Sequence, residues 1–91
     1  MNIKEALTAL GSEQESIANY LRVNNIKGYR CKSHMCPIAT YLDRCGFKDV
    51  QIGGQVAWHG GGYARQWEPL SMALIQFIKS FDAGQYPELE E

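Results

Sequence analysis

Two features are scarce in this sequence: long apolar runs and an excess of charge of either sign. No stretch approaches the roughly 18 consecutive apolar residues of a membrane span, so we expect no membrane partner. Nine Lys and Arg nearly balance ten Asp and Glu, which gives a formal net charge of −1. Proteins held mainly by nucleic-acid phosphates usually carry a strong basic excess. A nucleic-acid partner is therefore disfavoured.

Cysteine is also sparse, and it is present in an odd number. Cys31, Cys36 and Cys45 form no CxxC pair, the spacing most typical of structural zinc sites. The first ten residues include Lys4 and Glu5 and have too few apolar residues for a secretory signal. We therefore expect reduced thiols and a soluble protein in the cytoplasm.

An apolar pattern that indicates a helix occurs twice, 21 residues apart. In each copy an Ile, a Tyr and a Leu lie at positions i, i+3 and i+4, on one face of a helix. Each copy then has a residue that tolerates a left-handed backbone, followed by an apolar residue that can contact the last turn. The pattern predicts two similar helices with similar ends. Its residues are Ile17, Tyr20, Leu21, Asn25 and Ile26, and then Ile38, Tyr41, Leu42, Gly46 and Phe47.

Capping signals set the starts of the first helices. Asn2 with Glu5 predicts a short helix within residues 1–10. Ser12 with Glu15 predicts the start of a second helix, over residues 12–24.

A cysteine and a proline mark the start of the third helix. Cys36 as N-cap and Pro37 at the first helical position predict a helix over residues 37–45, although Ser33 offers an earlier cap. Cys45 falls on the apolar stripe of this helix, where we expect a small core residue.

The period then changes from helix to strand. Residues 48–67 alternate apolar and polar side chains between the glycine turns at 53–54 and 60–62, which predicts two or three antiparallel strands.

Glu68 and Pro69 predict the start of a last helix over residues 69–83, followed by an acidic end over 84–91. The chain is then one α+β domain, residues 1–91, with the C-terminal helix packed on a small meander. The exposed edges of such a sheet make a homodimer plausible.

The tryptophans allow two interpretations. Alternation favours burial of Trp58 and Trp67 under the last helix, with His59 and Arg65 outside. Alternatively both tryptophans form a partner surface, because Trp, Tyr and Arg dominate binding hot spots.

The residues that we favour for binding lie in two segments. A basic corner at Arg22, Lys27, Arg30 and Lys32 would attract an anionic ligand or an acidic partner. We expect the contact surface to combine Arg30, Lys32 and His34 with the hairpin residues His59, Tyr63 and Arg65.

A cysteine nucleophile is the alternative. Cys36 at a helix start would have its thiolate stabilised by unpaired N–H groups, and His59 would act as its base. A cysteine at a helix start followed later in the chain by a histidine on a strand resembles the arrangement in papain-like cysteine hydrolases, although the tryptophan beside the papain cysteine is absent. The resemblance implies a hydrolase or a thiol-dependent transferase.

A metal site is the third interpretation. Cys31, His34 and Cys36 would supply three zinc ligands, with Cys45 or His59 as the fourth. The spacing is poor, and we favour neither a metal nor any other cofactor.

Two motifs carry a resemblance to a known group. Residues 36–42 read CPIATYL and residues 81–89 read FDAGQYPEL. Together they resemble small uncharacterised proteins of actinobacteria and their phages. The resemblance implies a bacterial or phage origin and no activity, cofactor or fold. We therefore expect a non-catalytic binding module that contacts a protein, which would be a host protein if the chain is phage-encoded.

Overall fold

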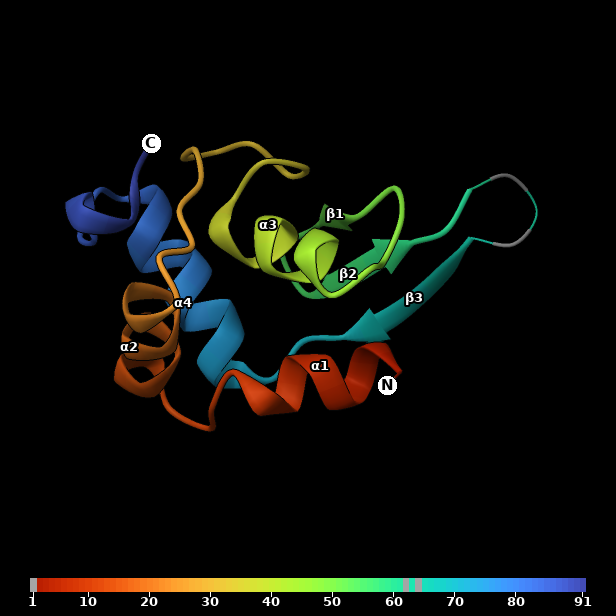
Figure 1. The fold of residues 1–91 in the computed structure, drawn as a ribbon, viewed down its shortest axis with the longest axis horizontal. Helices are drawn as coiled ribbons and strands as arrows, with labels where there is room; N and C mark the ends of the chain where they lie inside the picture. The colour runs from red at the N-terminus through yellow and green to blue at the C-terminus, as the bar shows by residue number, and fades with distance from the viewer. Residues whose placement is uncertain (1, 62, 64) are drawn as a thin grey trace.

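The computed structural model describes residues 2–61, 63 and 65–91 and has the predicted α+β fold (Figure 1). Three helices precede a three-stranded antiparallel sheet, and a fourth helix follows it. Among the described residues, the elements are α1 (Ile3–Ala9), α2 (Gln14–Val23), α3 (Pro37–Arg44), β1 (Gln51–Ile52), β2 (Val56–His59), β3 (Gln66–Pro69), α4 (Met72–Asp82) and the short 3-10 helix η2 (Pro87–Leu89).

The sheet has one covered face. Its strand order is β1-β2-β3, with Ile52 opposite Ala57 and Trp58 opposite Trp67. Helix α3 packs against β1 and α1, whereas α4 packs on the sheet and against α2 (Figure 1). None of the helices in the described part of the chain has the length and apolar content needed to cross a bilayer.

The starts of two helices are confirmed and one is corrected. The Asn2 side chain accepts the Glu5 N–H at 2.8 Å, and Glu5 accepts the Asn2 N–H in return. Cys36 is the N-cap of α3, with Pro37 in its first turn. The predicted Ser12 cap is wrong, because α2 begins only at Gln14, after an extended Glu13 whose side chain makes no capping bond.

The ends of both repeated helices are confirmed. Asn25 and Gly46 have positive φ angles of 54° and 101°. The next residue in each copy, Ile26 or Phe47, donates its N–H to the carbonyl of Leu21 or Leu42 at 2.9 and 3.1 Å. This is the Schellman hydrogen bond that satisfies a carbonyl of the last turn.

The predicted start of the last helix at Glu68–Pro69 is wrong. Pro69 belongs to β3, opposite Val56, and α4 begins at Met72 after the Ser71 cap. The Ser71 hydroxyl accepts the Leu74 N–H at 3.2 Å, which fixes this start. Proline is tolerated in β3 because an edge strand does not need every N–H for its ladder.

Glycine permits one very close approach between backbones. A Cβ on Gly28 would lie 2.5 Å from the backbone carbon of Cys36 and the nitrogen of Pro37. The connector of residues 24–36 therefore passes directly against the start of α3. Its neighbour on the other side is the acidic end of the chain, since Gly28 forms an isolated parallel bridge with Glu90.

Candidate binding surface

Trp58 and Trp67 lie side by side on the uncovered face of the sheet. They are opposite each other in the β2–β3 register, and 37% and 58% of their surfaces are exposed. Burial under the last helix, the interpretation that alternation favoured, is therefore wrong. The buried position in β2 belongs to Ala57, which lies opposite Ile52 on the covered face.

The register extends this surface along both strands. Val56 and Pro69 are the next pair on the same face, because side chains two apart in a strand share a face. Gln51 lies opposite Trp58 on the other side. We call Gln51, Val56, Trp58, Trp67 and Pro69 the tryptophan face.

Arg65 lies beside the tryptophan face and contacts two of its residues, Trp58 and Gln51. Its guanidinium carbon lies 5.8 Å from the centre of the Trp58 ring, within cation–π range. The same group donates to the Gln51 side-chain oxygen at 2.8 Å and to the Gly60 carbonyl at 3.1 Å. Arg65 therefore links β1, β2 and the hairpin tip, and it restricts the orientation of the Trp58 indole.

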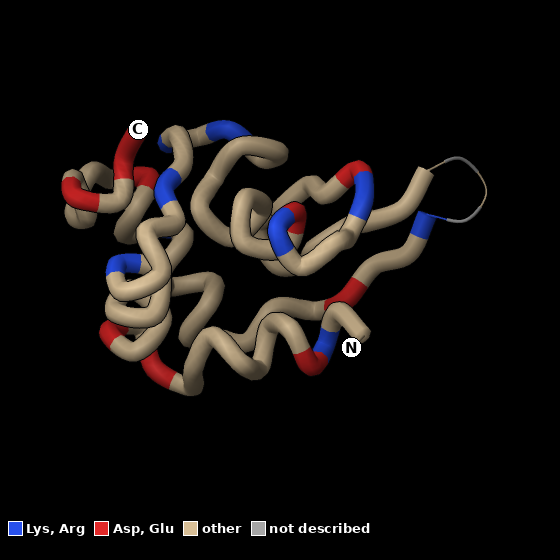
Figure 2. Tube along the Cα trace, in the orientation of Figure 1, with Lys and Arg blue, Asp and Glu red and all other residues tan. Residues whose placement is uncertain are grey.

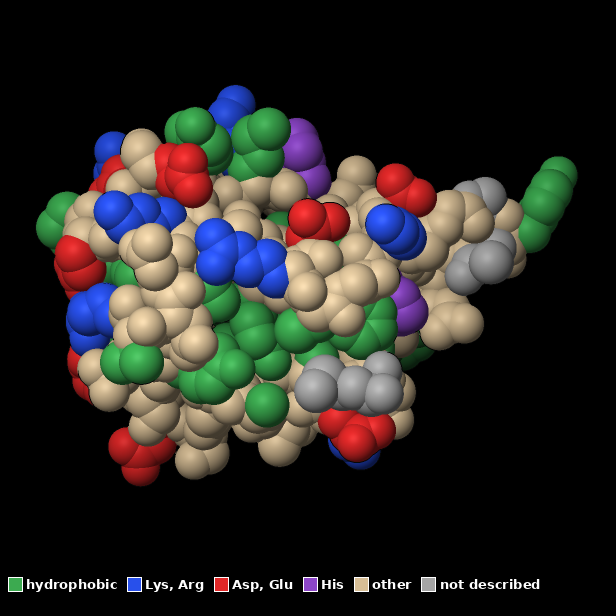
Figure 3. Space-filling model, viewed as in Figure 1, with side chains coloured by type: hydrophobic (Ala, Val, Ile, Leu, Met, Phe, Trp, Pro, Cys, Tyr) green, Lys and Arg blue, Asp and Glu red, His purple; other side chains and the backbone are tan. Residues whose placement is uncertain are grey.

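Tyr63 is fully exposed at the tip of the β2–β3 hairpin. Strands β2 and β3 lead away from the helices toward this tip (Figure 1), and a hydrophobic side chain extends from that end of the molecule in the space-filling view (Figure 3). Gly62, part of the predicted glycine turn, lies outside the described residues.

His59 lies elsewhere than predicted for a partner surface. Its ring meets Phe47 edge-to-face, with centroids 5.4 Å apart. It lines a pocket with Asn2, Lys4 and Gln66, next to α1. His59 therefore belongs to the α1 side of the sheet and not to the tryptophan face.

The three predicted connector residues are also dispersed. Arg30 forms an ion pair with Glu90 at 3.0 Å. Lys32 lines a pocket of about 210 Å³ beside Cys36, whereas His34 lines a different pocket of about 320 Å³ with Asp49. Of the six predicted binding residues, Arg65 is therefore the one whose contact with a tryptophan supports the predicted surface.

Cys36 lies in a setting that opposes a reactive thiolate. The residue is 4% exposed, and its sulfur accepts the Ala39 N–H at 3.5 Å. Burial raises the pKa of the Cys36 thiol, and the Asp82 carboxylate raises it further, whereas the N–H groups at the helix start lower it. Burial is the largest of these effects, so the lowering expected from the helix start is outweighed. Cys36 and His59 line separate pockets.

The cysteines do not converge on a metal site in the part of the chain that the structure describes. No three His, Cys, Asp or Glu side chains are grouped there in a way that could hold an ion. Cys31 and Cys45 are exposed. The expected core position of Cys45 is therefore wrong: it is the C-cap of α3, where the chain leaves the apolar stripe.

Sequence reasoning missed Gln51 and Pro69 as members of the candidate surface. The outward position of Gln51 follows from its place between Val50 and Ile52, both buried. The sequence predicts Pro69 at the start of a helix, and no local signal indicates the strand instead.

Comparison with known proteins adds no further assignment. No family model, curated protein or solved structure matches this chain.

Proposed function

We propose that this protein is a small non-catalytic binding module that contacts a protein partner through the tryptophan face. The observation that carries the proposal is the exposure of Trp58 and Trp67 as direct cross-strand neighbours. Two large aromatic side chains side by side offer a partner much apolar area at low conformational cost. Most of the other large apolar side chains in the described chain are in the core.

The polar groups around this face support a protein partner. Arg65 and the two indole N–H groups are hydrogen-bond donors, and Arg65 is already oriented by Gln51 and Gly60. A preorganised surface loses less side-chain entropy on binding than a flexible one. The balanced charge of the chain gives no electrostatic support for nucleic acid.

The expected cellular setting of the protein is bacterial. The protein would act in a bacterial cytoplasm and, if phage-encoded, on a host protein. A homodimer through the outer edge of β3 would be compatible with such a role, because the side chains of Trp58 and Trp67 project from the face of the sheet and do not take part in backbone pairing at that edge.

The test compares two exposed apolar side chains. Trp67→Ala removes the more exposed tryptophan, and Val23→Ala removes a side chain that is 78% exposed on α2, outside the face. Partners captured by the unmodified protein are first identified and purified. The affinity of each purified partner is then measured for the two immobilised variants and for the unmodified protein. We expect Trp67→Ala to weaken binding at least tenfold, as for an interface hot spot, and Val23→Ala to leave it unchanged.

Equal affinities for the two variants would show that the contact lies on another surface. Circular dichroism of both variants checks that the fold is kept. Sedimentation of the unmodified protein over a range of concentrations tests the homodimer separately.

A further inference from the structure

The acidic end of the chain is bound to the rest of the molecule through its backbone. The Gly28 N–H donates to the Leu89 carbonyl at 2.9 Å, and the Glu91 N–H donates to the Gly28 carbonyl at 3.0 Å. These bonds attach residues 85–91, which we call the C-terminal segment, to the connector of residues 24–36. After the 3-10 helix η2, the segment therefore pairs with the connector at a single parallel bridge between Gly28 and Glu90.

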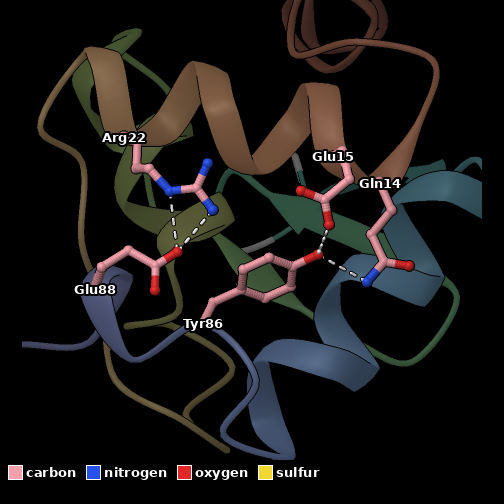
Figure 4. Close-up of polar contacts among 5 residues, drawn as sticks. All are labelled: Gln14, Glu15, Arg22, Tyr86 and Glu88. Carbon is pink, nitrogen blue, oxygen red and sulfur yellow. Dashed lines mark hydrogen bonds and ion pairs between the residues drawn. The ribbon is translucent and has the colours of Figure 1, made fainter.

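Two apolar side chains anchor the segment. Leu89 is 1% exposed, and the Tyr86 ring lies against Phe77 of α4 with centroids 5.1 Å apart. The Tyr86 hydroxyl accepts a hydrogen bond from Gln14 at 2.9 Å and donates one to Glu15 at 3.1 Å (Figure 4). The start of α2 and the face of α4 thus form a receiving site for a tyrosine.

Two ion pairs add charge complementarity. The Glu88 carboxylate accepts from both Nε and Nη2 of Arg22, at 3.0 and 2.7 Å (Figure 4). Arg30 pairs with Glu90 at 3.0 Å, so acidic and basic residues face each other beside the C-terminus (Figure 2). The predicted basic corner is therefore partly covered by the chain itself.

The C-terminal segment, which includes the 3-10 helix η2, is thus held by backbone hydrogen bonds, buried anchors and flanking ion pairs, which are also features by which proteins bind peptides. We propose that the surface formed by α2, the connector and α4 is a binding site for an acidic peptide segment of a protein partner. In the isolated chain, the C-terminal segment occupies this site. A competing segment would present an aromatic side chain, then a leucine, with glutamates around it, in the order of residues 86–90.

The C-terminal segment has the properties of a displaceable occupant. Both of its ion pairs are partly solvent-exposed, and pairs near the surface contribute little and are screened by salt. Gly84, with a φ of 84°, separates the segment from α4. A segment held by two buried side chains, Tyr86 and Leu89, opens at a lower free-energy cost than the whole fold.

The experiment uses a synthetic peptide of residues 84–91 as the probe. It is titrated into the isotopically labelled full-length chain and into a full-length Glu88→Ala, Glu90→Ala variant, and amide signals are followed by NMR. The double variant weakens only the occupant and leaves the receiving residues Arg22, Gly28 and Arg30 intact. The control peptide has lysine in place of the glutamates that correspond to Glu88 and Glu90.

We expect saturable shifts at Arg22, Gly28 and Arg30, with about threefold to tenfold tighter binding in the double variant, because its own segment competes less well. The lysine peptide should bind at least tenfold more weakly. Absence of saturable shifts at these residues in either folded protein would overturn the proposal, as would equal binding of the lysine peptide. The same shifts appearing without peptide as protein concentration rises would also overturn it, since a second copy of the chain would then be the occupant.

Discussion

Tyr41 donates its hydroxyl hydrogen to the backbone carbonyl of Ala6 at 2.6 Å, which joins α3 to α1 across 35 residues of sequence. Both residues are buried. Tyr20, the counterpart of Tyr41 in the other copy of the repeated pattern, packs edge-to-face on its ring at 5.7 Å. The two similar helices therefore meet through equivalent tyrosines, and Tyr41 in addition bonds to α1.

Removing the Tyr41 hydroxyl should measure the strength of this link. Tyr41→Phe keeps the ring and its packing but leaves the Ala6 carbonyl without this donor. We expect the free energy of unfolding to fall by about 1–2 kcal/mol, the usual cost of losing a buried hydrogen bond. Urea denaturation of the two proteins provides the measurement, and an unchanged midpoint would show that the bond contributes nothing net.

The same substitution should change the response to alkaline pH. Burial raises the pKa of Tyr41 above its usual value of 10.0, and the neighbouring Cys45 raises it further. Tyr41 therefore stays protonated in the folded state at pH values where the unfolded chain ionises. Its contribution to stability is complete below pH 10.0 and is lost as pH rises toward the folded-state pKa.

Denaturant midpoints from pH 7 to 11 test this dependence. Tyr41→Phe should show a shallower loss of stability above about pH 10 than the unmodified protein. Part of the loss should persist, because burial also raises the pKa of Tyr86. Parallel curves for the two proteins would exclude Tyr41 as a source of the alkaline transition.

Gly28 should tolerate no side chain. A Cβ there would meet the backbone of Met35, Cys36 and Pro37, which has no flexible end to move aside. We expect Gly28→Ala to lower the free energy of unfolding by more than about 2 kcal/mol or to prevent folding, as for other severe overpacking. Gly54→Ala is the matched control, since nothing lies within 4 Å of its Cβ position. Similar thermal midpoints for both variants would contradict the close approach.

Thiol labelling should separate the three cysteines. Cys31 and Cys45 are exposed, whereas Cys36 is buried and its pKa is raised. We expect Cys36 to react with iodoacetamide at neutral pH far more slowly than the other two, and all three to react alike in urea. Mass spectrometry of the peptides gives the rates. Fastest reaction at Cys36 in the folded protein would instead favour the nucleophile.

Arg65 should control the environment of Trp58. We expect Arg65→Ala to shift the emission of Trp58 and to lower the free energy of unfolding by no more than about 1 kcal/mol, because the contact is partly exposed. The measurement uses a Trp67→Phe background, so that emission reports Trp58 alone. Arg44→Ala is the control, since within the described residues the Arg44 side chain donates its hydrogen bonds to the Asn24 and Asn25 carbonyls, away from the tryptophans. An identical emission shift in both variants would show that Arg65 does not hold the indole.

Local chemistry made several elements predictable. The Asn2–Glu5 capping box, the Cys36–Pro37 helix start and the ends at Asn25 and Gly46 each depend on contacts within about five residues. The same reasoning failed at Ser12 and at Pro69. In both places the sequence allows a helix to begin at several neighbouring positions, and only the packing of the helix selects one of them.

The amino-acid sequence by itself determined the α+β class, the two similar helices and their ends, because hydrophobic period and capping act over one or two turns. Only the tertiary structure decided which face of the sheet is covered. Alternation separates Ala57 from Trp58 but does not say which of them faces the helices, and α3 and α4 cover the side of Ala57. The tertiary structure likewise decided the place of the C-terminal segment, because Arg22 and Glu88 are 66 positions apart in the sequence and meet only in the folded chain.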